Sequence, residues 1–354
     1  MTRRVLVARL DSMGDVLITG PAVRAVAREA EVVMLCGPRG AAAAALLPGV
    51  AEVLVWDAPW IADPAPAATD EHIGRLRELI AAADVTEAVI LTSFHQSPLP
   101  LALILRLAGV TRIAGASVDY AGSLLDVRLR PGEDLPEDIP EVERALAIAA
   151  AAGFAPEGDR RMRVATPPDM SALTGADPYI VVHPGAAVDA RRWPPERFAR
   201  TAALLVEVGR RVVVTGSAGE QDLVDLVVAA APGAVDLAGD LELSQLAGVL
   251  AGADVVIVGN TGPAHLAAAV GTPVVSLFSP VVPAIRWAPY GVPVALLGDQ
   301  EAPCRGTRAR NCPVPGHPCL AGVAPEEAAA SAIRLADEHA RIPSPHSSKD
   351  GVTA

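Results

Sequence analysis

Acidic and hydroxyl side chains gather just after the first apolar run of the chain, in residues 9–21 (RLDSMGDVLITGP). Pro21 is a favoured first residue of a helix, so this stretch should leave the end of a β-strand and open a helix at about that position. Gly14 lets the backbone turn sharply beside the carboxylate of Asp15. On these residues alone two interpretations remain open: the acidic residues and Ser12 only cap the helix, or Asp15 takes part in chemistry.

A second candidate stretch is residues 182–198 (VHPGAAVDARRWPPERF), which begins where an apolar run ends. Arg191 and Arg192 stand together just before a helix start at Trp193-Pro194. A guanidinium group can bind a phosphate or diphosphate with two parallel hydrogen bonds. The stretch is therefore a candidate anion site.

The third stretch is residues 258–266 (VGNTGPAHL), where a strand ends and Pro263 enters a helix. Free amides of Thr261, Gly262 and Ala264 would face an incoming anion, with the helix dipole behind them. His265, on the first turn, is expected either to contact phosphate or to pack against the sheet. Many α/β loops have this physics, so the pattern alone does not identify the ligand.

Two further places are weaker candidates. Gly216 and Ser217 follow the run RRVVVTG and begin another helix, where they could line a nucleotide pocket. Arg286 lies in an R-W-x-P-x-G loop after the strand-like run PVVSLFS. The loop with Cys304, Cys312, His317 and Cys319 matches no common zinc spacing, so we expect a structural loop with free thiols, with zinc or a disulfide as alternatives.

Missing motifs narrow the chemistry. The sequence has no G-x-G-x-x-G, no P-loop, no H-E-x-x-H and no G-x-S-x-G, which disfavours a dinucleotide enzyme, an NTPase, a zincin and an α/β-hydrolase. It also has no D-x-D pair to hold Mg²⁺ on a sugar diphosphate. We expect no metal and no cofactor, and arginines and helix N-termini to balance any leaving diphosphate.

Composition limits the partners and the location. The 354 residues are 51% hydrophobic but only 3% aromatic, and the net charge is −12. An acidic chain without a dense basic run is not expected to bind nucleic acid. The first apolar run is too short and too charged for a signal peptide or a membrane span, so we expect a cytoplasmic protein without a transmembrane segment.

Short apolar runs alternate with helical patterns along the whole chain, which predicts an α/β fold with parallel sheets. Strands are expected at 5–10, 31–36, 52–56, 87–92, 111–115, 179–183, 210–216, 235–239, 254–259, 273–279 and 292–298. We predict a helix over 138–152, a loop over 119–136, a Pro-rich linker at 156–178 and a disordered tail at 342–354. Two Rossmann-like domains, 1–155 and 179–341, would then face a central cleft, with ligands beyond the carboxyl ends of the strands.

Together the three stretches resemble the signatures of glycosyltransferase family 9, the ADP-heptose-using heptosyltransferases of lipopolysaccharide cores. The first two patterns are R-x-x-S-x-G-D-V-x-x-T-x-P and H-P-G-A followed by a basic residue before W-P. The third is D-[ST]-G-x-x-H-L-A-A-A-x-G-T-P, which this chain matches except at its first position. The resemblance covers residues 1 to about 340 and implies a GT-B fold. It also implies that the N-terminal domain binds the acceptor and the C-terminal domain the nucleotide sugar.

The resemblance assigns roles residue by residue. Asp15 would be the catalytic base, with acceptor contacts at Ser12, Gly14 and Thr19. The implied donor contacts are His183, Gly185, Ala186, Arg191, Arg192, Gly216, Ser217, Asn260, Thr261, Gly262, Pro263, His265 and Arg286. Two positions depart from the family: Arg191 stands where lysine is usual, and Asn260 where aspartate is usual.

The expected function is therefore inverting, metal-independent transfer of a sugar, most simply a heptose from ADP-heptose, to a hydroxyl of a glycan, a lipid-linked sugar or a small molecule. Such a reaction would serve cell-envelope glycan synthesis. The alternatives are a GT-B epimerase or hydrolase of nucleotide sugars, and a non-catalytic nucleotide-sugar-binding homologue. A requirement for an acceptor distinguishes a transferase from an epimerase or hydrolase. Any turnover excludes the non-catalytic homologue.

Overall fold

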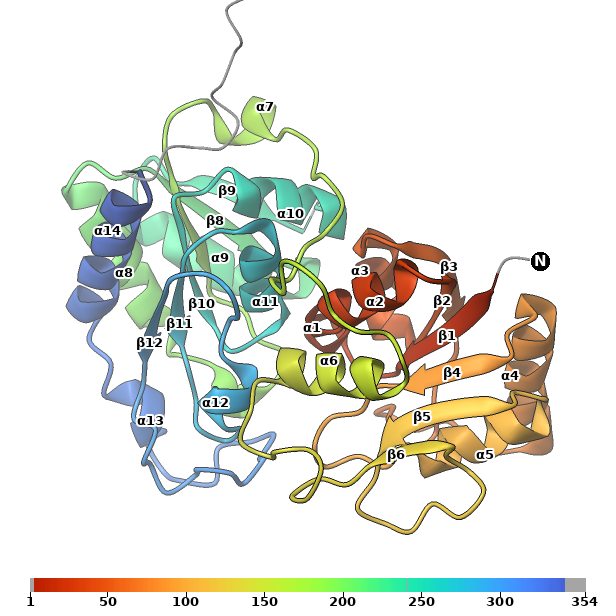
Figure 1. Ribbon diagram of the computed structural model, residues 1–354. Coiled ribbons are helices and arrows are strands. Elements are labelled where there is room, and N and C mark those ends of the chain that lie inside the picture. The colour runs from red at the N-terminus through yellow and green to blue at the C-terminus, as the bar shows by residue number, and fades with distance from the viewer. Residues whose placement is uncertain (1–2, 240, 341–354) are drawn as a thin grey trace, which may run out of the picture.

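The structure is a computed structural model that describes residues 3–239 and 241–340. Two six-stranded parallel sheets stand side by side, each with helices on its faces (Figure 1). This confirms the predicted α/β fold with parallel sheets. Residues 156–178 connect the two sheets. The predicted tail, 342–354, lies outside the described residues.

The N-terminal sheet has the strand order β3-β2-β1-β4-β5-β6. Its strands are β1 (Arg4–Arg9), β2 (Glu31–Cys36), β3 (Val50–Val55), β4 (Glu87–Ile90), β5 (Arg112–Ala116) and β6 (Val127–Leu129). The helices of this half are α1 (Met13–Ile18), α2 (Gly20–Ala27), η1 (Pro38–Gly40), α3 (Ala41–Leu46), α4 (Asp70–Ala83), α5 (Leu99–Leu107) and α6 (Glu141–Ala151). The order reverses direction between β1 and β4, so the loops after these two strands open at a switch point where ligands bind in such sheets.

The C-terminal sheet has the order β12-β11-β10-β7-β8-β9. Its strands are β7 (Ile180–His183), β8 (Val212–Gly216), β9 (Val235–Ala238), β10 (Val255–Gly259), β11 (Val274–Leu277) and β12 (Val294–Leu297). The helices are α7 (Ser171–Thr174), η2 (Asp189–Arg191), α8 (Pro195–Glu207), η3 (Ala218–Glu220), α9 (Gln221–Ala230), α10 (Leu243–Ala251), α11 (Gly262–Val270), α12 (Ala284–Trp287), α13 (Pro318–Ala321) and α14 (Pro325–Ala340). The switch point here lies between β7 and β10.

The central strands explain why the sheets form. Strand β10 reads VVIVG and strand β7 reads IVVH, and every residue of both is buried. Runs of β-branched residues suit strands that helices cover on both faces. Because the chain has few aromatic residues, Ala, Val, Leu and Ile fill these cores.

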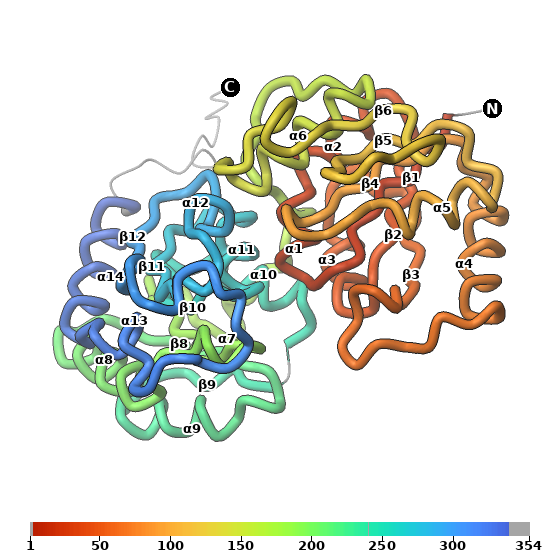
Figure 2. Tube along the Cα trace, turned by 90° about the horizontal axis from the view of Figure 1, so that it is seen from below, coloured from red at the N-terminus to blue at the C-terminus, as the bar shows by residue number. Residues whose placement is uncertain are grey.

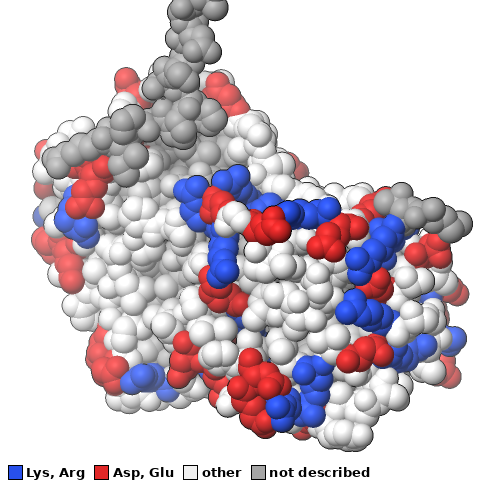
Figure 3. Space-filling model, viewed as in Figure 1, with Lys and Arg blue, Asp and Glu red and all other residues white. Residues whose placement is uncertain are grey.

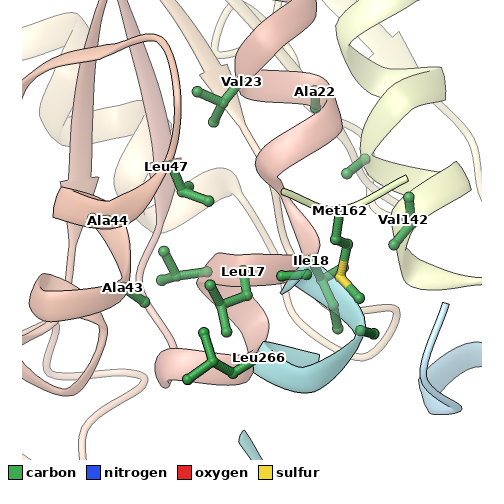
Figure 4. Packing of buried hydrophobic residues seen from close by; sticks show 14 of the residues in the cluster. Leu17, Ile18, Ala22, Val23, Ala43, Ala44, Leu47, Val142, Met162 and Leu266 are labelled. Atoms are coloured by element: carbon green, nitrogen blue, oxygen red, sulfur yellow. The ribbon is translucent and has the colours of Figure 1, made fainter. Parts of the chain in front are cut away.

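The two halves meet through helices α1 and α11, which lie side by side in both views (Figures 1 and 2). Leu17 and Ile18 of α1 belong to the same buried cluster as Leu266 of α11 (Figure 4). Glycines make the close approach possible: a Cβ on Gly14 would stand 2.9 Å from His265 Cδ2 and 3.3 Å from Gly262 Cα. The stretch 9–21 and the stretch 258–266 are therefore in direct contact.

Several sequence-based expectations need correction. Helix α1 was not predicted; it begins at Met13, where Ser12 and Asp15 cap the chain. The helix expected at about Pro21 is α2, which begins at Gly20 with Pro21 as its second residue. The predicted loop 119–136 contains the short strand β6, and the linker contains α7. Helix α14, which packs on the C-terminal sheet, was not predicted.

Candidate active site

A cavity of about 480 Å³ lies between the two halves, where the strand ends of both sheets face each other. Many of the predicted site residues line it: Ser12, Gly14, Asp15, Ala186, Arg191, Asn260, Thr261, Gly262 and His265. The structure thus brings the three sequence stretches to one place. Another cavity, of about 410 Å³, lies between α2 and the linker, and none of the predicted site residues line it.

Asp15 lies in the first turn of α1, directly beyond the carboxyl end of β1. Its Oδ2 accepts hydrogen bonds from the Ser12 hydroxyl at 2.6 Å and from the Ser12 backbone N–H at 3.2 Å. Its Oδ1 accepts one from Arg9 Nη2 at 2.9 Å. The carboxylate therefore caps α1 and also lines the cavity.

Arg9 is the buried cation that organises this corner, with only 2% of its surface exposed. Its Nε lies 2.8 Å from Asp11 Oδ2, and its Nη1 lies 3.8 Å from Glu141 Oε2. Its Nη2 also donates to the Ser93 hydroxyl at 2.7 Å. A buried arginine is stable only when such partners compensate its charge.

The charge state of Asp15 follows from these contacts. Burial by itself would raise the pKa of the carboxyl, but Arg9 and the hydrogen bond from Ser12 outweigh it, so the pKa lies below the usual aspartate range. The carboxylate is therefore ionised near neutral pH. An ionised carboxylate that faces a cavity can accept a proton there.

Arg191 faces Asp15 from the C-terminal half. Its Nη1 donates to the backbone oxygen of Asn260 at 3.4 Å, and its Nε is buried without a hydrogen-bond partner among the described residues. Both side chains line the same cavity. Burial lowers the pKa of Arg191, and the Asp15 carboxylate only partly opposes this. Arg192 instead donates to Ala186 O at 2.9 Å and does not line the cavity.

The N-terminus of α11 points at the cavity, but fewer amides are free than we expected. Thr261 N donates to Gly259 O at 2.9 Å and Ala264 N to Thr261 O at 3.1 Å. Of the three amides that we expected to be free, the amide of Gly262 remains the candidate for binding an anion. The Asn260 side chain is buried and bonds the Ser279 backbone in both directions at 3.4 Å, which ties it to the end of β11.

His265 lines the cavity and is almost fully buried. Burial lowers its pKa to about 4, so the imidazole is neutral near pH 7. Its Nδ1 is buried without a hydrogen-bond partner among residues 3–239 and 241–340. A neutral ring can donate one hydrogen bond to a ligand but adds no positive charge.

The remaining predicted residues do not line this cavity: Thr19, His183, Gly185, Arg192, Gly216, Ser217, Pro263 and Arg286. Thr19 is buried, and its hydroxyl donates to Val16 O at 2.6 Å. His183 Nδ1 pairs with the Thr215 hydroxyl at 3.0 Å. Ser217 donates to Glu220, whose carboxylate lies so close to Gly185 that a Cβ there would stand 2.0 Å from it.

Arg286 turns toward the N-terminal half rather than into the cavity. Its guanidinium lies 3.9 Å from the centre of the Phe94 ring, and its Nη2 is 3.5 Å from Asp138 Oδ1. The neighbouring Trp287 lines the cavity instead.

Sequence reasoning missed part of the lining. Residues Ser93, Phe94, His95 and Gln96 follow the end of β4, and Arg39, Arg308 and Arg310 add positive charge. Residues 93–96 could have been predicted to line the site, because they directly follow a central strand. The arginines lie in η1 and in the cysteine loop, far apart in sequence, and no local pattern joins them.

The described part of the chain holds no group of three or more His, Cys, Asp or Glu side chains that could bind a metal ion. Its cysteines, Cys36, Cys304, Cys312 and Cys319, are free thiols. No described helix is long and apolar enough to span a membrane. On the face drawn in Figure 3, basic and acidic side chains are interleaved, without one large patch of either sign.

Two facing parallel sheets with a cavity at their strand ends define the GT-B class of glycosyltransferases, and solved structures agree. A family 9 glycosyltransferase from Veillonella parvula superimposes with a TM-score of 0.77 at 16% identity, covering 95% of this chain and 98% of that one. The ADP-heptose lipopolysaccharide heptosyltransferase II of Escherichia coli gives 0.73 at 20% identity, covering 95% and 99%.

Sequence comparisons identify the family. The profile of glycosyltransferase family 9 (heptosyltransferase) matches residues 95–316, so the chain belongs to this family. Lipopolysaccharide heptosyltransferase 1 of Pseudomonas aeruginosa is 29% identical over 328 residues, 87% of each chain. Lipooligosaccharide heptosyltransferase 2 of Haemophilus influenzae is 33% identical over 119 residues, which span 32% of this chain and 34% of that protein. The protein is therefore a glycosyltransferase that is similar to the heptosyltransferases.

Proposed function

We propose that this chain is an inverting, metal-independent glycosyltransferase that moves a heptose from ADP-heptose to a hydroxyl of a glycan, a lipid-linked sugar or a small molecule. The observation that carries the proposal is that Asp15 and Arg191, one from each half, line the same cavity. A base on one wall and an anion-binding group on the other are what displacement at an anomeric carbon needs.

The proposed reaction is a single displacement. The acceptor oxygen attacks the anomeric carbon while Asp15 takes its proton, and the bond from that carbon to the diphosphate oxygen breaks. The electron pair of that bond leaves with the diphosphate. Arg191 and the N-terminus of α11 stabilise the charge that develops there. One displacement on the face opposite the leaving group inverts the anomeric configuration.

Family relatives support the choice of donor. An E. coli heptosyltransferase whose structure has a TM-score of 0.66 to this chain was solved with ADP, and the same enzyme was solved with ADP-2-deoxy-2-fluoro heptose. Asn260 departs from the usual aspartate, and its amide holds Ser279 here. We therefore place the weight of donor binding on the diphosphate site rather than on this residue.

The experiment that tests the proposal is release of ADP from ADP-heptose by the purified chain, with and without acceptor hydroxyls. Acceptor-dependent release with formation of a glycoside is expected. Release of ADP and free heptose without an acceptor would instead show a hydrolase, and an isomerised sugar would show an epimerase.

Metal removal is a separate prediction. Since the described residues hold no cluster of metal ligands and the sequence has no D-x-D pair, we expect turnover to survive EDTA unchanged. The measurement is ADP release before and after chelation. Complete loss that Mg²⁺ or Mn²⁺ restores would contradict the proposed charge balance by Arg191.

Arg191 should discriminate diphosphate from bare nucleoside. Replacing it by alanine removes a charged hydrogen-bond donor from the cavity, and we expect ADP binding to weaken by about 1.5–3 kcal/mol. Adenosine binding should change little, because only the phosphates lose a partner. Calorimetry with both ligands measures the difference.

Arg192→Ala is the matched control, since its guanidinium bonds Ala186 O and lies outside the cavity lining. We expect it to leave the ratio of ADP to adenosine affinity unchanged. Equal losses for both ligands in Arg191→Ala would assign that residue a role in the fold instead.

A further inference from the structure

A buried carboxylate, Glu141, stands behind the proposed base. It is the first residue of α6, and only 1% of its side chain is exposed. The nearest charged nitrogen is Arg9 Nη1, at 3.8 Å from its Oε2. Among the described residues neither carboxylate oxygen receives a hydrogen bond. Burying a carboxylate without hydrogen bonds costs free energy, so the presence of Glu141 at this position calls for an explanation.

Other unpartnered polar groups occur in the residues around Glu141. Arg144 Nη1, Arg286 Nε and Thr92 Oγ1 are likewise buried without hydrogen-bond partners in the described part of the chain. Arg286 comes from α12 in the other half of the molecule and reaches over Phe94. The cluster thus lies between the two halves rather than inside one hydrophobic core.

Arg9 joins this cluster to Asp15. The guanidinium presents Nη2 to Asp15, Nη1 to Glu141 and Nε to Asp11. One positive charge is therefore shared among three carboxylates. If one of them loses its charge, its repulsion of the other two disappears and their ionised forms become more stable.

The titratable and charged groups that face these carboxylates set the order in which they protonate. Glu141 faces Arg9, Arg144, Asp15 and Arg286; burial raises its pKa and the arginines only partly oppose this. Asp15 faces Arg9, Asp11, Ser12, His95, Arg191 and His265, and its pKa is lowered. Burial also raises the pKa of Asp11, so both Glu141 and Asp11 are protonated before Asp15 as the pH falls.

We propose that Glu141 is a positioning residue for the transfer reaction: its carboxylate shares the charge of Arg9 with Asp15 and so keeps Asp15 basic enough to take the proton of the acceptor. This inference rests on the proposed role of Asp15. Protonation of Glu141 removes its repulsion of the Asp15 carboxylate and makes Asp15 a weaker base. The acid limb of activity then belongs to Glu141, together with Asp11, and not to Asp15.

The test is the pH profile of kcat for the wild type and Glu141→Gln. The wild type should lose activity with a midpoint above the usual glutamate range. The carboxamide has the shape of the protonated acid, so Glu141→Gln should lose the part of this limb that Glu141 contributes and keep only the part due to Asp11. We expect its rate at neutral pH to be about three- to tenfold below wild type, as a base weakened by about one pKa unit would give.

Two further variants separate charge from packing. Glu141→Asp keeps a carboxylate and should keep an acid limb. Arg286→Gln removes a cation that lowers the pKa of Glu141, so the limb should move to higher pH. Glu143→Gln, two residues along the same helix and bonded to Tyr290, is the matched control and should leave the limb in place.

Combining Glu141→Gln with Asp15→Asn distinguishes a failure of this inference from a failure of the proposed role of Asp15. If Asp15 is the base and Glu141 acts through it, Glu141→Gln causes no further loss in that background. Wild-type turnover of Asp15→Asn would overturn the role of Asp15 as the base in the proposed function. An inactive Asp15→Asn together with an unchanged acid limb in Glu141→Gln would overturn this inference alone.

Discussion

Asp15→Asn should lower turnover by about 10² to 10⁴, the usual loss when a general base is removed. Asparagine has the same shape and still accepts a hydrogen bond at one oxygen, but it cannot take the proton of an attacking hydroxyl. ADP affinity should stay near the wild-type value, because Arg191 and the α11 N-terminus remain in place. Turnover is measured by ADP release at saturating donor, and affinity by calorimetry.

Asp11→Asn is the comparison that isolates the base. Asp11 also pairs with Arg9, but its carboxylate accepts a hydrogen bond from Gln96 rather than capping α1. We expect a distinctly smaller loss than for Asp15→Asn. Turnover of Asp15→Asn within threefold of the wild type would exclude Asp15 as the base, and equal losses in both variants would assign the effect to the surroundings of Arg9.

Arg9→Met should destabilise the fold by about 3–5 kcal/mol, the range for removing one partner of a buried ion pair. Without the guanidinium, Asp11, Asp15 and Glu141 are left close together in a buried corner. The free energy of unfolding in urea measures the loss. Turnover should fall as well, because Asp15 loses a hydrogen bond that orients it.

The pH dependence of this loss gives a second check. Arg9 lowers the pKa of Asp15 in the folded state, so their interaction stabilises the fold above the ordinary aspartate pKa and is lost as the pH falls through the lowered value. The gap between wild type and Arg9→Met should therefore narrow in acid. Arg112→Met, an exposed partner of Glu87, should cost no more than about 1 kcal/mol. A loss that small for Arg9→Met would contradict the account of the buried corner.

Local patterns were sufficient for the fold and for the main motifs. Uninterrupted apolar runs such as that of β10 predict buried parallel strands, because a strand covered on both faces has no polar side. Candidate site residues such as Asp15, Arg191 and Gly262 could be named because they lie near a strand end and a helix start, and a few neighbouring residues mark both. Helix α1 was not predicted, although the hydrogen bonds between Ser12 and Asp15 that cap it join neighbouring residues.

The sequence by itself determined the strand runs, the motifs and the resemblance that names the family. Tertiary structure alone decided that Asp15 and Arg191 share one cavity, that Arg286 turns to Phe94, and that Glu141 stands behind Arg9. The physical reason is range: propensities and caps act over a few residues, whereas these contacts join positions more than a hundred residues apart. The two halves meet where α1 packs on α11, and the glycines at positions 14 and 262 permit that approach.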